Sequence, residues 1–320
     1  MHHNKSVLIT DGVHPVLFKH LESAGYHCEY RPEIHTNEVN QIIAEYTGII
    51  INSKITVDKV MLDKAVRLKF IGRLGSGLEI IDLNYAAEKG VAVYNSPEGN
   101  RNAVAEHALG MLLALANNFL QADAQVRQKV WQREANRGFE IMGQTVGIIG
   151  FGHTGSTFAT KLAGMGVRVL AYDKYKLRYT NHHPYVEETD METIFREADI
   201  ISLHLPLTAE TRHLVNLDFI KKFAKKIIII NTSRGKVVKI TDLIAGLESG
   251  KVRGACLDVF ENEKPQTLNE NENDVYEKLY KFDNVILTPH VAGWTAESKR
   301  RLAEVLAEKI ISSGEYASSE

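Results

Sequence analysis

Short apolar runs alternate with amphipathic stretches along nearly the whole chain. Val7 to Thr10 and Gly48 to Asn52 have the length of buried strands, whereas Pro15 to Ala24 repeats its apolar residues at the spacing of a helix face. Strands separated by helices of about ten residues are typical of βαβ units. The pattern therefore predicts an α/β protein built on parallel sheets.

The same alternation continues in two blocks. In the first block we expect further strands at Leu68 to Arg73 and Val91 to Asn95, and helices at Val57 to Val66 and Asp82 to Lys89. A longer helical pattern from Asn102 to Val130 then marks the crossing into a second domain. The second block has six predicted strands: Thr145 to Gly150, Val167 to Tyr172, Ile200 to His204, Ile227 to Asn231, Gly254 to Asp258 and Val285 to Thr288. Six strands are what a full dinucleotide-binding sheet needs.

Two further segments complete the pattern. Glu261 to Asp274 is rich in Glu and Asn, which predicts a solvated loop, and Ala296 to Ser312 predicts a final amphipathic helix. Because the chain ends at Glu320, we expect no regulatory domain after the catalytic core.

Composition narrows the class of protein. A chain of 320 residues with 44% hydrophobic and 24% charged residues suits a globular protein of two domains. The net charge of −2 excludes the basic surface that nucleic acids or anionic membranes require. No apolar run approaches the roughly 20 residues of a membrane span, and the polar N-terminus gives no signal peptide. The two cysteines, Cys28 and Cys256, have no metal-ligand spacing, so we expect buried thiols, no bound metal and a cytoplasmic location.

A glycine-rich turn follows the first strand of the second block. Gly150, Gly152 and Gly155 form the pattern G-x-G-x-x-G, with His153 and Thr154 between the last two glycines. In a strand–turn–helix context this pattern binds the pyrophosphate of a dinucleotide at the helix N-terminus. An acidic residue at the end of the next strand, Asp173, would bind the adenosine ribose hydroxyls and repel a 2′-phosphate. The turn therefore predicts an NAD site, and the neighbouring Lys174 and Lys176 weaken the preference over NADP.

Three polar segments each follow a predicted strand in the second block. They are Asn231 to Gly235, Leu257 to Pro265 and Thr288 to Trp294. Ligands of an open parallel sheet bind outside the carboxyl ends of its strands, so we expect the three segments to converge on the cofactor.

These segments resemble the D-isomer-specific 2-hydroxyacid dehydrogenases, particularly the phosphoglycerate dehydrogenase-like branch. The similarity extends over Ile71 to Gly77, Asn95 to Leu109, the glycine turn and His204 to Thr211. It implies an oxidoreductase that transfers a hydride between NAD(H) and a small 2-hydroxy or 2-keto acid, with catalytic residues Arg234, Glu263 and His290. The family has Pro directly after this Glu, whereas this chain has Lys264, which leaves Glu261, Glu270 and Glu272 as alternatives.

The chemistry of the three residue types suits this reaction. A histidine exchanges protons near neutral pH, so His290 can give a proton to the developing alkoxide. A carboxylate such as Glu263 would orient the ring and favour its protonated form. The planar fork of Arg234 can bind the substrate carboxylate and keto oxygen together.

The remaining cofactor and substrate contacts are predicted from the same segments. The cofactor is expected to contact Leu205, Pro206, Thr211, Thr232, Ser233, Asp258 and Gly293, with Asp258 and the Thr232–Ser233 backbone facing the nicotinamide. The substrate acid is expected to contact Asn52, Ser53, Lys54, Arg73, Gly75, Ser76 and Gly77, whose small residues expose backbone N–H groups to an anion. Phosphoglycerate dehydrogenases commonly carry Arg at the position of Asn52, so a glycerate-, glyoxylate- or lactate-type substrate stays open.

The resemblance also predicts the domain organisation. Residues 1–97 and 293–320 are expected to form a flavodoxin-like substrate domain, and residues 98–292 an inserted Rossmann-type NAD domain, both doubly wound. The long helix from Asn102 to Val130 is expected at a twofold homodimer interface. One alternative function from another class is an NAD-sensing corepressor-like protein, and another is a catalytically inactive relative.

Overall fold

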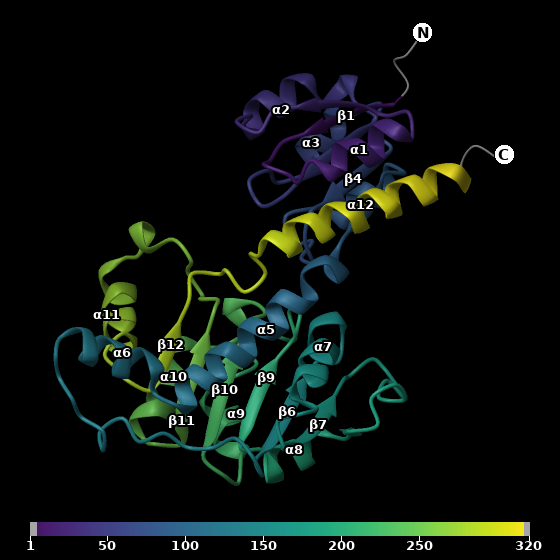
Figure 1. Ribbon diagram of the computed structural model, residues 1–320. Helices are drawn as coiled ribbons and strands as arrows, with labels where there is room; N and C mark the ends of the chain where they lie inside the picture. Colours follow the sequence, from purple (N-terminus) through teal and green to yellow (C-terminus); the bar gives the residue numbers. More distant parts are fainter. Residues whose placement is uncertain (1–4, 317–320) are drawn as a thin grey trace. The chain divides into compact units, whose positions relative to one another are not determined.

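The chain folds into two compact units in this computed structural model, which describes residues 5–316 (Figure 1). One unit contains the described residues up to Arg101 and those from Trp294 onward, and the other contains Asn102–Gly293. The first crossing therefore lies inside helix α5 (Pro97–Ala116) rather than at its start. The outer ends of the predicted substrate domain, 1–4 and 317–320, lie outside the described residues.

A five-stranded parallel sheet forms the centre of the first unit. Its strands are β1 (Ser6–Ile9), β2 (His27–Tyr30), β3 (Gly48–Ile51), β4 (Phe70–Arg73) and β5 (Ala92–Asn95). They lie in the order β2-β1-β3-β4-β5, which is the flavodoxin-like arrangement. The predicted doubly wound fold of this part of the chain is thus confirmed.

Helices cover both faces of this sheet. Helices α1 (Val16–Ser23) and α12 (Ala296–Tyr316) pack on one face, where Leu17, Leu306 and Ile310 are buried. The other face carries α2 (Thr36–Ile42), the 3-10 helix η1 (Ile43–Glu45), α3 (Lys59–Lys64) and α4 (Leu83–Glu88). Helix α12 thus returns the end of the described chain to the unit in which the chain began.

A seven-stranded parallel sheet forms the centre of the second unit. Its strands are β6 (Thr145–Ile149), β7 (Arg168–Tyr172), β8 (Val186–Glu188), β9 (Ile200–Leu203), β10 (Ile227–Asn231), β11 (Val252–Leu257) and β12 (Val285–Leu287). The order β12-β11-β10-β9-β6-β7-β8 is that of a dinucleotide-binding sheet extended by one strand, which confirms the predicted Rossmann-type fold. The order reverses at β6, so the turn after β6 lies at the switch point where such sheets bind ligands.

Both faces of the second sheet are also covered by helices. Helices α5 and α7 (His153–Leu162) bury Leu112 and Phe158 against one face. The other face carries α8 (Met191–Glu197), α9 (Leu217–Lys222), α10 (Ile240–Glu248) and α11 (Glu270–Leu279). The central strands read as uninterrupted apolar runs, such as Ile227–Ile230, because both of their faces are buried.

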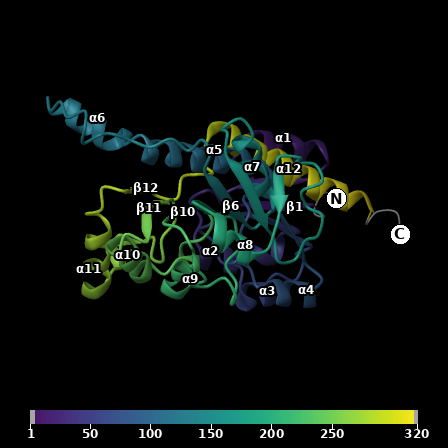
Figure 2. The same cartoon turned by 90° about the horizontal axis from the view of Figure 1, so that it is seen from below.

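The prediction of one helix from Asn102 to Val130 is wrong. Helix α5 ends at Ala116, and α6 (Phe119–Arg127) follows after a bend of 63°. Asn118 adopts a left-handed conformation with φ 52°, and the free carbonyl of Ala116 accepts a hydrogen bond from the N–H of Phe139 at 2.9 Å. The returning chain thus caps α5, while α6 extends away from the sheet of its own unit (Figure 2).

Two edge strands and helix α11 are among the elements that the sequence pattern did not predict. Strands β2 and β8 lie at the edges of their sheets and have few buried residues, so their apolar pattern is weak. The predicted number of six strands in the second block is therefore wrong by one, because it left out β8. Part of the predicted loop from Glu261 to Asp274 is helical, because Asn269 and Glu272 form a capping box that starts α11 at Glu270. Cys28 is partly exposed, and only Cys256 is the buried thiol we expected.

No single helix in residues 5–316 is long and apolar enough to cross a membrane. Helices α5 and α6 reach that length only when they are taken together across their bend.

Candidate active site

The glycine turn connects β6 to α7 as the sequence predicts. Gly150 has φ 92°, and a Cβ there would lie 2.3 Å from the carbonyl oxygen of His204. A Cβ at Gly155 would lie 2.1 Å from the oxygen of Gly150, so both positions require glycine for close packing. Gly152, the N-cap of α7, has open space where its Cβ would be. The turn thus leaves room for a pyrophosphate against the N–H groups of His153 and Thr154 in the first turn of α7.

Asp173 follows β7 and closes this turn from the side. Its Oδ2 accepts a hydrogen bond from the N–H of Phe151 at 2.9 Å, and its Oδ1 accepts one from the N–H of Tyr175 at 3.0 Å. Lys174 pairs with Glu210 at 2.7 Å, and the Lys176 ammonium donates to the carbonyl of Phe151. Both lysines therefore have partners within the protein.

The loop after β9 is shaped by its own hydroxyl groups. The Thr211 hydroxyl donates to the carbonyl of Pro206 at 2.6 Å and accepts from the N–H of Thr208 at 2.8 Å. This bonding fixes the path of Leu205, whose side chain would touch a Cβ at Gly150. Thr211 therefore shapes the loop, and Leu205 and Pro206 lie beside the glycine turn.

An unpartnered hydroxyl lies at the end of β10. The Oγ1 atom of Thr232 is buried and has no hydrogen-bond partner among the described residues. A buried hydroxyl without a partner is costly, and a bound cofactor amide or hydroxyl could satisfy it. Together with the open space at Gly152, this atom shows that the residues present fit a dinucleotide.

Arg234 projects from a tight turn after β10. The side chain of Asn231 holds this turn, since it donates to the carbonyl of Arg234 and accepts from both the N–H and the hydroxyl of Ser233. The Arg234 guanidinium donates to the carbonyl of Ser233 at 2.7 Å. A Cβ at Gly235 would lie 1.7 Å from the carbonyl oxygen of Phe260, so glycine lets this turn pack directly on the loop after β11.

Glu263 and His290 are in direct contact. Nδ1 of His290 lies 2.8 Å from Oε2 of Glu263, and both side chains stay partly exposed. The hydrogen bond to Glu263 raises the pKa of His290, although burial opposes it. Burial acts to raise the pKa of Glu263, but the bond and charge of His290, the N–H of Phe260 and the charge of Arg234 together lower it. The charge of Arg234 also acts to lower the pKa of His290. The structure thus brings Arg234, Glu263 and His290 together, as predicted from the resemblance.

The other glutamates of this region have different partners. Glu261 accepts from the N–H of Ile240 at 2.9 Å and contacts Nε2 of His213 at 2.6 Å. Glu272 accepts from the N–H of Asn269 in the capping box of α11. The contact with His290 therefore singles out Glu263 despite the Lys264 that follows it.

The carboxylate of Asp258 is buried beneath the histidine loop. Its Oδ1 accepts from the hydroxyl of Thr288 at 2.6 Å and the N–H of Val291 at 2.9 Å, and its Oδ2 accepts from the N–H of Ala292 at 2.8 Å. The side chain has almost no exposed surface, so in this conformation it holds the loop rather than facing a nicotinamide as we expected. The same loop ends at Gly293.

A second histidine, which the sequence analysis missed, completes this cluster. Nε2 of His107 on α5 lies 2.9 Å from the hydroxyl of Thr288 and 3.6 Å from Oδ1 of Asp258. The sequence held one signal for this residue: His107 is a polar residue close to Ala105, Ala108 and Leu112, which are buried on the same helix. His204, by contrast, is a core residue, since burial lowers its pKa to about 3 and its ring lies against Phe158.

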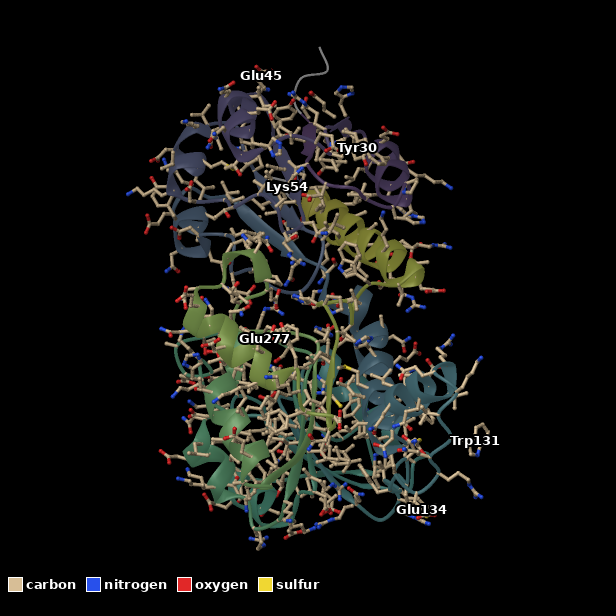
Figure 3. The ribbon with its side chains drawn as sticks, turned by 90° about the vertical axis from the view of Figure 1, so that its left-hand side faces the viewer. Tyr30, Glu45, Lys54, Trp131, Glu134 and Glu277 are labelled. Atoms are coloured by element: carbon tan, nitrogen blue, oxygen red, sulfur yellow. The ribbon has the colours of Figure 1, made fainter. Side chains whose placement is uncertain are left out.

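The predicted substrate residues lie after β3 and β4 in the first unit. The N–H of Asn52 donates to the Asp11 carboxylate at 2.9 Å, while Ser53 and Lys54 are exposed. The Lys54 ammonium, labelled in Figure 3, donates to the carbonyl of Pro32 at 2.5 Å. Asn52 and Lys54 are therefore both tied to neighbouring backbone or side chains of this unit.

The loop after β4 exposes backbone N–H groups. Gly75 has φ 145°, and its missing Cβ leaves space for the Arg73 guanidinium, which donates to the carbonyl of Leu74. Asn95 donates to the carbonyl of Ser76 at 2.7 Å and fixes the loop. Within residues 5–316 the N–H groups of Ser76 and Gly77 make no hydrogen bond, as a carboxylate-binding loop requires.

The second unit therefore combines a dinucleotide turn, a carboxylate–histidine pair and an arginine at one edge of its sheet. This combination is typical of nicotinamide-dependent oxidoreductases.

Comparisons with known proteins identify the family. The model of the D-isomer specific 2-hydroxyacid dehydrogenase NAD binding domain matches residues 109–292. The hydroxypyruvate reductase of Thermotoga maritima is 38% identical over 277 residues, which cover 87% of this chain and 88% of that protein. The chain belongs to the D-isomer specific 2-hydroxyacid dehydrogenase family, and it is an NAD-dependent enzyme.

Two further relatives widen the comparison. The D-3-phosphoglycerate dehydrogenase of Archaeoglobus fulgidus is 32% identical over 305 residues, which are 95% of this chain and 56% of that protein. The chain spans about half the length of four such phosphoglycerate dehydrogenases and 73% of that from Haemophilus influenzae. The crystal structure of D-lactate dehydrogenase from Aquifex aeolicus, complexed with NAD and lactic acid, has a TM-score of 0.80 and 28% identity, and covers 96% of this chain and 94% of its own.

The Glu263–His290 pair predicts a specific pH dependence. We expect the reduction of a 2-keto acid to need protonated His290, so the rate should fall as the pH rises through the raised pKa of this group. Glu263→Gln removes the main cause of that raised pKa, and we expect the fall in kcat/KM to move about one pH unit lower. Glu270→Gln in the same segment is the control and should leave the profile unchanged. An unshifted profile for Glu263→Gln would show that the carboxylate does not act on His290.

Asp173 predicts the choice of cofactor. Asp173→Asn keeps an oxygen that accepts from the N–H of Phe151 but removes the charge that would repel a 2′-phosphate. We expect the ratio of NADPH to NADH affinity, measured by fluorescence titration, to rise about tenfold. Asp190→Asn, at the N-cap of α8, removes a charge elsewhere in the unit and should leave the ratio as it is. An unchanged ratio in Asp173→Asn would mean that another group reads the ribose.

Proposed function

We propose that this enzyme reduces a small unphosphorylated 2-keto acid with NADH, and that hydroxypyruvate is the preferred substrate. The observation that carries the proposal is the neutral Asn52 at the position where phosphoglycerate dehydrogenases commonly have Arg. The similarity to a hydroxypyruvate reductase over most of both chains supports the same substrate.

The cations near Asn52 do not replace the missing charge. The Lys54 ammonium is engaged by the carbonyl of Pro32, and the Arg73 guanidinium lies over Gly75 and donates to the carbonyl of Leu74. If the Lys54 ammonium or the Arg73 guanidinium turned to bind a phosphate, its hydrogen bond within the first unit would be lost. Within the first unit, recognition of the substrate carboxylate alone needs only the N–H groups of Ser76 and Gly77.

His290 would supply the proton of the reaction. Nδ1 of its ring is held by Glu263, which leaves Nε2 to donate to the keto oxygen of the substrate. Arg234 would stabilise the developing alkoxide and hold the acid in place through its planar fork. When NADH is bound, it supplies the hydride.

The cofactor would be held by the first turn of α7 and the loops after β9 and β10. The N–H groups of His153 and Thr154 would bind the pyrophosphate, and Asp173 would read the ribose. Thr232 would give its unpartnered hydroxyl to the cofactor. Gly293 and the Ser233 backbone would lie toward the nicotinamide.

The same enzyme would act as a homodimer in the cytoplasm. Large apolar side chains are exposed on α6 and the residues after it: Phe119, Leu120, Val126 and Trp131, the last of them 78% exposed. Figure 3 shows Trp131 directed away from the chain. Contiguous exposed apolar residues of this kind mark protein interfaces, and a second copy of the chain would cover them. The free thiols of Cys28 and Cys256 suit a reducing compartment.

A substrate panel tests the proposed specificity. We expect kcat/KM for hydroxypyruvate to exceed that for 3-phosphohydroxypyruvate by about tenfold or more, measured by the loss of NADH absorbance. Asn52→Arg should reduce this ratio, because an arginine fork binds a phosphate, whereas Asn52→Gln should not. Preference of the wild type for the phosphorylated acid would show that Lys54 and Arg73 suffice as the anchor. No turnover with any 2-keto acid, with NADH binding retained, would favour the corepressor-like alternative.

Light scattering tests the dimer. We expect twice the chain mass of 35.8 kDa for the wild type at micromolar concentration. Leu120→Glu combined with Trp131→Glu places charges on the apolar surface and should yield monomers. Val66→Glu, an exposed apolar residue of the first unit, is the matched control and should remain dimeric. A monomeric wild type would contradict the proposal.

A further inference from the structure

The second unit contains a cavity that none of the predicted catalytic, cofactor or substrate residues lines. It has a volume of about 580 Å³, within the roughly 300–1,000 Å³ typical of small-molecule sites. Its lining comes from the loop after β9, the 3-10 helix Gly235–Val237 after β10, the start of α10, the loop after β11 and helix α11. The residues used below are Arg212, His213, Lys236, Glu261, Asn262 and Tyr276.

The carboxylates in the wall of this cavity have partners among the residues that the structure describes, whereas its two cations do not. Of the two carboxylates in its wall, Glu261 is engaged by the N–H of Ile240 and Nε2 of His213, and Glu272 by the capping box of α11. In the described part of the chain, neither the guanidinium of Arg212 nor the ammonium of Lys236 makes a hydrogen bond or ion pair. The cavity thus presents two uncommitted cations beside carboxylates that are already satisfied.

The two cations are held on a rigid frame. The N–H of His213 donates to the carbonyl of Lys236 at 2.7 Å, and Val215 pairs with Val238 as an isolated parallel bridge. His213 has a left-handed backbone with φ 52°, which the bonds of its neighbours fix. The backbones that carry Arg212 and Lys236 are therefore bonded to each other at one edge of the cavity.

We propose that this cavity binds a small acid with two or more carboxylate or phosphate groups, held between Arg212 and Lys236. An arginine fork binds such an oxyanion by paired hydrogen bonds, and a lysine adds a point charge. Ile240, Val275 and Tyr276 add apolar surface to the lining for the carbon skeleton.

The occupied cavity would act on the catalytic pair through the loop after β11. Glu261 and Asn262 belong to the wall and directly precede Glu263, whose carboxylate contacts His290. The N–H of Asn262 donates to the hydroxyl of Tyr276 at 3.1 Å, and its Oδ1 accepts from the N–H of Lys264 at 3.0 Å. A ligand that contacts this wall therefore shifts the segment that holds Glu263. This second effect rests on the proposed function, whereas the binding itself does not.

Calorimetry on the NADH-saturated protein tests the site. NADH is added first because the glycine turn could also hold an anion, and bound NADH would block that turn. The probes are pyrophosphate and citrate, at constant ionic strength. We expect one of them to bind with one site per chain, and Arg212→Gln with Lys236→Gln to weaken it at least about tenfold. Stronger binding of pyrophosphate would identify a phosphorylated ligand, and stronger binding of citrate a polycarboxylic acid.

A charge-matched control separates the site from general attraction of anions. Lys221→Gln with Lys226→Gln removes the same charge from exposed positions outside the cavity and should bind as the wild type does. Equal losses in both double variants, equal binding by all three proteins, or no binding by the wild type would overturn the site. Unchanged NADH affinity of the variants confirms their fold.

The pH dependence of 2-keto acid reduction tests the coupling. The bound probe should shift the pH at which kcat/KM falls in the wild type, but not in the Arg212→Gln, Lys236→Gln variant. Binding without this shift would overturn the coupling while leaving the site. If no acid is reduced, the proposed function fails, and calorimetry still decides whether the site exists.

Discussion

The carboxylate of Asp258 lies fully buried at the end of β11 and accepts hydrogen bonds from Thr288, Val291 and Ala292. A buried charge is tolerated only when its oxygens are satisfied, so the loop after β12 has little freedom to leave it. The carbonyl of Asp258 also accepts from the N–H of His290. One residue thus fixes the backbone on both sides of the histidine that contacts Glu263.

The remaining parts of the site depend on how closely three loops approach one another. Gly235 lets the Arg234 turn lie against the carbonyl of Phe260, and the N–H of Phe260 in turn lies 3.4 Å from Oε1 of Glu263. Arg234 is therefore near enough to lower the pKa of His290, while Glu263 raises it more strongly. The net result is a raised pKa of His290 with an arginine close to the pair.

The sequence predicted those features that arise from local pattern or from a family motif. Both parallel sheets and the glycine turn could be predicted from the strand-length apolar runs and the residues that follow them. The meeting of Glu263 with His290 was implied by the family resemblance. Edge strand β8 could not be predicted, because only one of its three residues is buried. Nor could the break after Ala116, which depends on a hydrogen bond from Phe139, far along the chain. The role of Asp258 also needed the structure, since its partners come from a loop some thirty residues later.

The left-handed backbone of His290, with φ 56°, has a consequence for how this protein can change. A side chain other than glycine in that conformation costs on the order of 1 kcal/mol, and this cost falls on the residue that contacts Glu263. Glycine or asparagine would relieve the strain but would remove the imidazole from this contact. Stability and the histidine–carboxylate pair therefore make opposite demands at this position.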